Sequence, residues 1–324
     1  MSYSSPQQAY KAESIDTTHY RPFSHAAFPF DRTDADLILR STDLIDFRVH
    51  RAILEMSSSF FANPSDVLDS CSGGMSSAEE GGLPICHINA TGHILDLLLR
   101  HPYPVPTPDV DDMDAAYALL RVSREYGFAL VVDGLKRTIL RFAEANPLKA
   151  YARAAMLGCK EEMQLAARIS LRYPILEEYV PELEELSAGI YHRLLSYHRL
   201  CGRVAAAVVD DMEWAALHDG SPAPAWLTCH LCPSFKVGAF PKSKDRDLCA
   251  TSWFHTLVLT LKQGLRARPC GSTLFNSELS ETSLTEAMAC PVCHDTAAAE
   301  CRRLILLLKE EVNHAISKIR LHII

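Results

Sequence analysis

The sequence predicts an α+β fold, in which a small sheet with helices is followed by an all-helical C-terminal region. Short alternating apolar runs separated by turn residues predict the sheet, and helical apolar spacing predicts the rest. A chain of 324 residues is too long for one such domain. We therefore predict four segments: a flexible N-terminal segment at 1–31, the α+β domain at 32–146, a helical region at 147–220, and a helical C-terminal region with two CxxC pairs at 221–324.

The domain is predicted to begin with two strands and a helix. Residues 35–41 and 45–49 carry β-compatible patterns, and the polar Ser41-Thr42-Asp43 between them predicts a β-hairpin. From His50 the apolar spacing becomes helical, and a run of serines ends it just before Phe60-Phe61. The start of the domain is therefore a compact ββα unit.

This stretch resembles a known family. The pattern D-x-x-L-R-S-x-D-x-x-x-F-x-V-H-R-A-I-L-x-x-x-S-x-F-F, from Asp36 to Phe61, is similar to the opening of a BTB/POZ domain. Residues 83–88 resemble its third strand, 94–103 the next helix and tyrosine turn, and 116–128 the helix that closes it. The resemblance implies a protein-interaction domain that can form homodimers. It also implies core or interface roles for Asp36, His50, Ser58, Phe60, Phe61 and Tyr103.

Helices are predicted to follow. Val132-Asp133-Gly134 predicts a break, and Pro147 predicts the domain boundary. The A-x-x-L-G-C pattern at 154–159 resembles the start of the helical region that follows BTB domains in adaptor proteins. In those adaptors the region extends the contact surface for a cullin scaffold, so the resemblance implies a cullin as a partner.

A long helix is predicted after Ser187, whose side chain can cap its first turn. Its apolar positions form one stripe: Ile190, Leu194, Tyr197, Cys201, Val204 and Val208. The stripe fits a coiled-coil seam or a helix docked on its neighbours. We favour docking, because only about three heptads are apolar and the charges do not alternate cleanly. His192 and His198 are predicted to be solvent-exposed bystanders.

Two CxxC pairs in the last third predict a metal site. Two residues between thiolates let both point at one tetrahedral ion, so Cys229, Cys232, Cys290 and Cys293 form a candidate zinc site. Fifty-seven residues separate the pairs, so packing of the intervening helices must bring them together. His230 and His294 are substitute ligands. The bystanders are Cys249, Cys270 and Cys301.

Other uses of these cysteines stay open. Plain reduced thiols fit the sequence equally well, and redox chemistry fits it less well, because no βαβ pattern surrounds either pair. The W-x-x-C-x-x-C pattern, the R-x-R-P pattern at 266–269 and the A-x-x-C-P-x-C pattern also resemble the C-terminal part of many fungal BTB proteins.

Composition narrows the classes of function. A net charge of −8 at pH 7 argues against a broad nucleic-acid surface. The sequence has no signal-peptide core and no apolar segment of the ~20 residues needed to span a membrane. We therefore expect an intracellular protein, nuclear or cytoplasmic, with reduced thiols among its 11 cysteines.

The known catalytic motifs are missing from the sequence, including phosphate loops, HExxH and G-x-S-x-G. We therefore predict a non-enzymatic scaffold or adaptor that contacts protein partners and links one of them to a cullin-type ubiquitin ligase. The alternative is a transcription-associated scaffold whose C-terminal region is stabilised by zinc.

Overall fold

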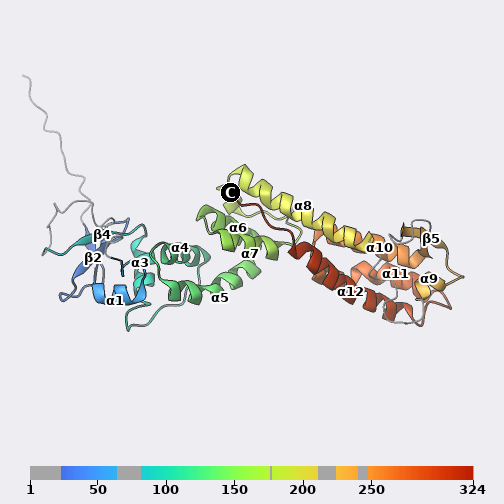
Figure 1. Ribbon diagram of the computed structural model, residues 1–324, viewed down its shortest axis with the longest axis horizontal. Coiled ribbons are helices and arrows are strands. Elements are labelled where there is room, and N and C mark those ends of the chain that lie inside the picture. Colours follow the sequence, from blue (N-terminus) through green and yellow to red (C-terminus); the bar gives the residue numbers. More distant parts are fainter. Residues whose placement is uncertain (1–22, 64–81, 176, 211–223, 240–246, 324) are drawn as a thin grey trace, which may run out of the picture. The chain divides into compact units, whose positions relative to one another are not determined.

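A computed structural model describes residues 23–63, 82–175, 177–210, 224–239 and 247–323 (Figure 1). The chain divides into two compact units, which are described separately below. The first takes its described residues from 1–108 and 126–129, and the second from 109–125 and 130–324. The architecture is mixed α+β, as the sequence predicts. Most of the segment predicted to be flexible lies outside the described residues.

The first unit contains a four-stranded sheet in the order β1-β3-β2-β4. Its strands are β1 (Ser24–His25), β2 (Leu37–Arg40), β3 (Ile45–Val49) and β4 (Ile85–His87). Strands β2 and β3 form the predicted antiparallel hairpin, with Leu37 opposite Val49. Strand β1 pairs in parallel with β3, and β4 in parallel with β2. Strand β1 therefore belongs to the sheet although its residues fall within the segment predicted to be flexible.

Side chains hold the turn between β2 and β3. Leu44 has a φ of 64°, a left-handed conformation that is costly for a residue other than glycine. The Ser41 hydroxyl donates to Asp43 Oδ1 at 2.6 Å and accepts from the Ile45 N–H at 2.9 Å. Asp43 also accepts a 2.8 Å hydrogen bond from the N–H of Gly92, so the turn is fixed to the next helix.

Two helices complete the first unit. Helix α1 (Arg51–Ser57) follows β3 directly, which confirms the predicted ββα start. Helix α3 (Gly92–Leu99) follows β4. Apolar residues of the strands and both helices are buried together because each element turns an apolar face inward. They include Leu37, Leu39, Val49, Leu54, Leu95 and Leu98.

The second unit begins with four helices: α4 (Met113–Glu125), α5 (Ala129–Ala145), α6 (Pro147–Met156) and α7 (Lys160–Ser170). The predicted break at 132–134 is wrong, because α5 continues through Gly134, which has no neighbour within 4 Å of its would-be Cβ. An exposed glycine costs a helix only about 1 kcal/mol. The break comes at Asn146, whose Oδ1 accepts from the Lys149 N–H at 2.9 Å and caps α6.

Helix α8 (Ala188–Asp210) is the long helix that the sequence predicts. The Ser187 hydroxyl accepts from the Ile190 N–H at 3.3 Å, which confirms the predicted cap. A 3₁₀ turn (Pro181–Leu183) precedes this helix. Helix α8 packs against α10 (Ser252–Ala267) and α12 (Ala297–Ser317) (Figure 1). Leu194 and Cys201 of its apolar stripe are fully buried, so the interpretation as a docked helix is the one the packing supports.

The two histidines of α8 differ in environment. His192 is exposed, as predicted. His198 is only 2% exposed, and its Nε2 lies 3.2 Å from the backbone oxygen of Tyr173, so the prediction that it is solvent-exposed is wrong. Burial lowers the pKa of His198 because the charged imidazolium would lose its hydration.

The C-terminal region is not all helical. Strands β5 (Ser234–Ala239) and β6 (Asp247–Thr251) form an antiparallel pair between α9 (Ala225–Thr228) and α10, so that part of the prediction is wrong. A 3₁₀ turn (Gly271–Phe275) and α11 (Glu278–Met288) separate α10 from α12. One apolar core joins these elements, and its members include Trp226, Trp253, Phe254, Leu261 and Leu308.

Candidate functional site

The first CxxC pair lies between α9 and β5. The Cys229 N–H donates to the Ala225 oxygen at 2.9 Å and thereby closes the single turn of α9. Trp226 on this turn stacks on Phe254 of α10, with ring centroids 4.0 Å apart and planes inclined by 8°. This buried stack fixes the short helix to the core and sets the position of Cys229. Cys232 then leads directly into β5.

The second pair lies between α11 and α12. The Cys290 N–H donates to the Ala287 oxygen at 3.1 Å, so the chain turns immediately after α11. The Cys290 oxygen accepts from the His294 N–H at 3.0 Å, and the Cys293 oxygen accepts from the Ala297 N–H at 2.9 Å. The loop is thus closed by its own backbone hydrogen bonds before α12 begins.

The structure brings the two distant pairs together. The sulfur atoms of Cys229 and Cys290 are 3.7 Å apart, and those of Cys232 and Cys293 are 3.9 Å apart. All four sulfur atoms lie within 4.8 Å of one another. Zinc–sulfur bonds of ~2.3 Å in a tetrahedron place the sulfurs about 3.8 Å apart, whereas a disulfide needs ~2.05 Å. The spacing therefore fits a four-sulfur metal site and does not fit disulfides.

Polar groups around the cluster favour the thiolate at Cys290 and partly offset the effect of burial at Cys293. The backbone N–H groups of Val292 and Cys293 point at the Cys290 thiol and lower its pKa to about 6. Burial raises the pKa of Cys293 to about 11, and the side chain of Trp253 lowers it by a smaller amount. The indole N–H of Trp253 is buried and has no hydrogen-bond partner, so a thiolate at Cys293 would offer it an acceptor.

The other predicted ligands do not join the cluster. The four cysteines form the cluster without His230, which is exposed, or His294, which lies 3.1 Å from the exposed Asp295. Cys249, Cys270 and Cys301 lie outside the cluster, as expected for bystanders. Among the residues that the structure describes, nine cysteines carry free thiols, but Cys86 is disulfide-bonded, so the expectation of reduced thiols is wrong at that position.

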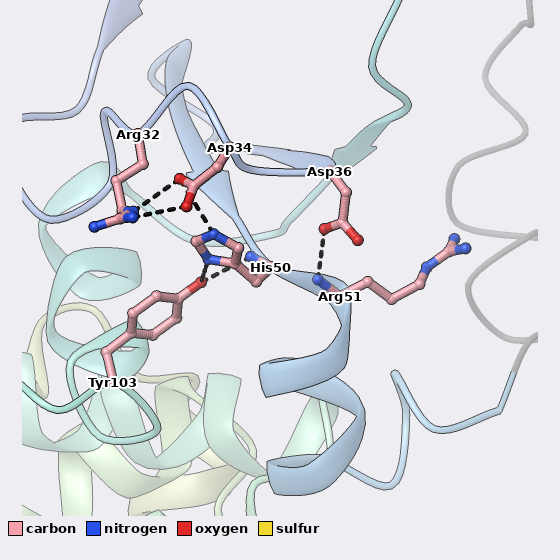
Figure 2. A network of polar contacts seen from close by, with 6 residues as sticks. All are labelled: Arg32, Asp34, Asp36, His50, Arg51 and Tyr103. Carbon is pink, nitrogen blue, oxygen red and sulfur yellow. Dashed lines mark hydrogen bonds and ion pairs between the residues drawn. The ribbon is translucent and has the colours of Figure 1, made fainter.

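A second polar arrangement lies in the first unit (Figure 2). Both carboxylate oxygens of Asp34 accept from Arg32, at 2.8 and 2.7 Å, and one lies 3.5 Å from His50 Nε2. The Tyr103 hydroxyl accepts from the His50 backbone N–H at 2.8 Å and lies 3.1 Å from its Nδ1. Asp36 accepts from the Arg51 N–H at 2.7 Å at the start of α1.

This network fastens the junction between β3 and α1. Burial raises the pKa of Tyr103, so its hydroxyl stays protonated and can act as acceptor for one N–H and donor to another group. No serine, threonine or cysteine belongs to the network drawn in Figure 2. The network holds the backbone N–H groups of His50 and Arg51 in place. Asp36, His50 and Tyr103 all belong to it. Sequence reasoning missed Arg32 and Asp34, which lie just before the recognised pattern.

The remaining residues of the predicted BTB set lie around the end of α1. The buried Ser58 hydroxyl donates to the Tyr126 oxygen at 2.6 Å and accepts from the Phe61 N–H at 3.2 Å. Phe60 meets Phe61 edge to face at 5.1 Å and Tyr126 at 5.2 Å. All six predicted residues thus make specific contacts within the first unit.

No protein-family model matches the chain, and no curated protein matches it. The BTB/POZ resemblance therefore stays a prediction from the sequence. In the described part of the chain, none of the helices is both long and apolar enough to cross a membrane.

Proposed function

We propose that the chain is a non-enzymatic protein-interaction scaffold with a BTB/POZ-type first unit and a C-terminal region held together by one zinc ion. The cluster of four cysteine sulfurs supports the zinc part of this proposal, and the resemblance in the sequence supports the scaffold part. Four protein ligands close a tetrahedral site and leave no position for a water or substrate, so the ion has a structural role. Residues Cys229, Cys232, Cys290 and Cys293 hold it.

The metal joins elements that are far apart in the chain. Cys229 and Cys232 lie between α9 and β5, whereas Cys290 and Cys293 lie between α11 and α12. The ion therefore fastens α9, the β5–β6 pair and α12 to one core. The apparent free energy of zinc binding to a structural site is about 10–16 kcal/mol. Binding of that strength stabilises a region whose own sheet has only two strands among the described residues. The region is then a rigid surface for partners.

The metal part is tested by elemental mass spectrometry on purified full-length protein. We expect one zinc per chain in the unaltered protein and none in a Cys229→Ser, Cys232→Ser double variant. The matched control is Cys249→Ser with Cys270→Ser, which removes two thiols outside the cluster. Zinc-free protein from zinc-supplemented cells, or equal zinc in both double variants, would refute the metal site.

The interaction part is tested with partners of stated class. The resemblance predicts that the full chain binds a purified cullin scaffold, and light scattering on the same sample reports self-association. The alternative, a transcription-associated scaffold, predicts salt-sensitive binding to double-stranded DNA that needs the zinc. A folded, zinc-loaded chain that stays monomeric and binds neither would contradict the scaffold proposal.

A further inference from the structure

The second unit has a cavity of about 470 Å³ lined by Ser196, Arg199, Gly202, Arg203 and Arg266. Arg199 and Arg203 are four residues apart on α8 and therefore project from the same side of that helix. Arg266 comes from the last turn of α10. Two helices thus direct three positive charges to one hollow.

These arginines have no counter-charge in the part of the chain that the structure describes. None of the three forms a hydrogen bond or ion pair with a described residue, and all three are exposed. The same two helices do form an ion pair elsewhere, between Lys262 of α10 and Asp210 of α8. Like charges at a spacing of four residues repel, so the arrangement is unfavourable until an anion arrives.

Gly202 makes the cavity possible. A Cβ at this position would lie 2.8 Å from the Arg266 oxygen and 3.3 Å from its Cα, so α8 and the end of α10 approach this closely only because residue 202 lacks a side chain. The close approach brings Arg266 beside the arginines of α8. Ser196, whose hydroxyl lies 3.2 Å from His192 Nε2, adds a neutral hydrogen-bonding group to the rim.

Guanidinium groups bind phosphate oxygens through two parallel hydrogen bonds, and three of them match the three free oxygens of a phosphate monoester. The cavity is larger than a single phosphate ion and leaves room for adjoining atoms. A nucleic acid fits less well, because its phosphates need a stripe of positive charge on the protein and this chain carries a net charge of −8.

We propose that this cavity binds a phosphorylated serine or threonine side chain of a partner protein. The inference rests on the proposed interaction function and gives the chemistry of one partner. Arg199 and Arg203 would hold the phosphate from α8, and Arg266 would hold it from α10.

The test uses fluorescence polarisation of the full-length chain with a degenerate peptide pool that carries one central phosphoserine. We expect the pool to bind at least ten-fold more tightly than its unphosphorylated counterpart. Arg203→Glu should weaken binding ten-fold or more. Arg137→Glu makes the same change of charge at an exposed arginine of α5 away from the cavity lining, and it should weaken binding less than two-fold.

Three results would overturn the proposal. The first is equal binding of the two pools, and the second is equal weakening by both arginine variants. The third is displacement of the peptide by inorganic phosphate at the same concentration as by unlabelled phosphopeptide. That third result would indicate a site for the free ion. Circular dichroism verifies that each variant is folded. A chain that binds a cullin or self-associates but ignores the phosphopeptide refutes this inference and leaves the proposed function intact.

Discussion

Replacing Trp253 with phenylalanine should weaken metal binding without dismantling the metal site. The indole N–H is buried without a hydrogen-bond partner, and a metal-bound thiolate at Cys293 would accept from it. Hydrogen bonds to charged groups contribute about 1.5–3 kcal/mol. Removal of a group that orients a metal ligand costs about 10–100-fold in affinity, which is the same range of energy. We therefore expect Trp253→Phe to bind zinc 10–100-fold less tightly.

Competition with a chromogenic zinc chelator on the full-length protein measures this change. Leu261→Ala is the control, because it removes buried volume from the same core about two turns further along α10, away from the cysteines' end of that helix. Both variants lose packing, so a general loss of stability would lower the two zinc affinities equally. An equal loss in both variants would show that the indole N–H of Trp253 does not support the metal ligand.

Three further predictions concern stability and are measured by urea unfolding. Burial keeps the pKa of His198 below its ordinary 6.5, so as the pH falls the unfolded chain takes up the proton before the folded chain does. The free energy of unfolding should therefore fall below pH 6.5, by at most about 1.4 kcal/mol per pH unit for this one group. His198→Gln should reduce that slope. Tyr103→Phe leaves the His50 backbone N–H without its acceptor and should lower the free energy of unfolding by about 1–3 kcal/mol. An unchanged free energy of unfolding would contradict the role of Tyr103 in holding the junction between β3 and α1. Gly127→Ala adds a Cβ at a residue whose φ is 69°, and this Cβ would lie 2.2 Å from the Ser59 hydroxyl oxygen. The substitution should therefore lower the free energy of unfolding by about 1–3 kcal/mol. Its control, Gly134→Ala in an open helical position, should instead stabilise by about 0.5–1 kcal/mol.

Local signals in the sequence were sufficient for the ββα start. Alternation over β2 and β3 and the Ser41-Thr42-Asp43 turn act within a few residues, so tertiary packing had little to override. The prediction of the four cysteine ligands also rests on local signals, since each CxxC spacing sets the geometry of its own pair. Their meeting depends on contacts 61 residues apart in sequence, and no local pattern specifies those.

The errors in the prediction have physical causes as well. Val132-Asp133-Gly134 predicts a break, but a glycine with open space around it weakens a helix without ending it. The sequence predicts an exposed His198 because lone histidines usually are exposed, whereas packing of α8 buries it against the Tyr173 oxygen. The sequence analysis does not predict the β5–β6 pair, because both strands lie beside cysteine and helix patterns that dominate this part of the sequence. Arg32 and Asp34 lay outside any recognised pattern.

Helix α10 connects the metal site to the arginine cavity, and this connection gives one more prediction. Trp253 stands at its first turn beside Cys293, and Arg266 stands at its last turn beside Gly202. At 1.5 Å per residue the two positions are about 20 Å apart on one rigid element. Loss of zinc frees the first turn of α10 from the cysteine cluster, so the position of Arg266 against α8 should become less defined.

Removal of zinc should therefore weaken phosphopeptide binding although no arginine has changed. We expect the Cys229→Ser, Cys232→Ser variant to bind the phosphoserine pool three-fold or more weakly than the Cys249→Ser, Cys270→Ser control. Returning zinc to chelator-treated, unaltered protein should restore the affinity, and returning it to the cysteine variant should not. If the zinc-free chain binds the pool as tightly as the zinc-loaded chain, α10 does not couple the two sites. The cavity would then be set by the packing of α8 and α10 alone, for which Gly202 is the requirement.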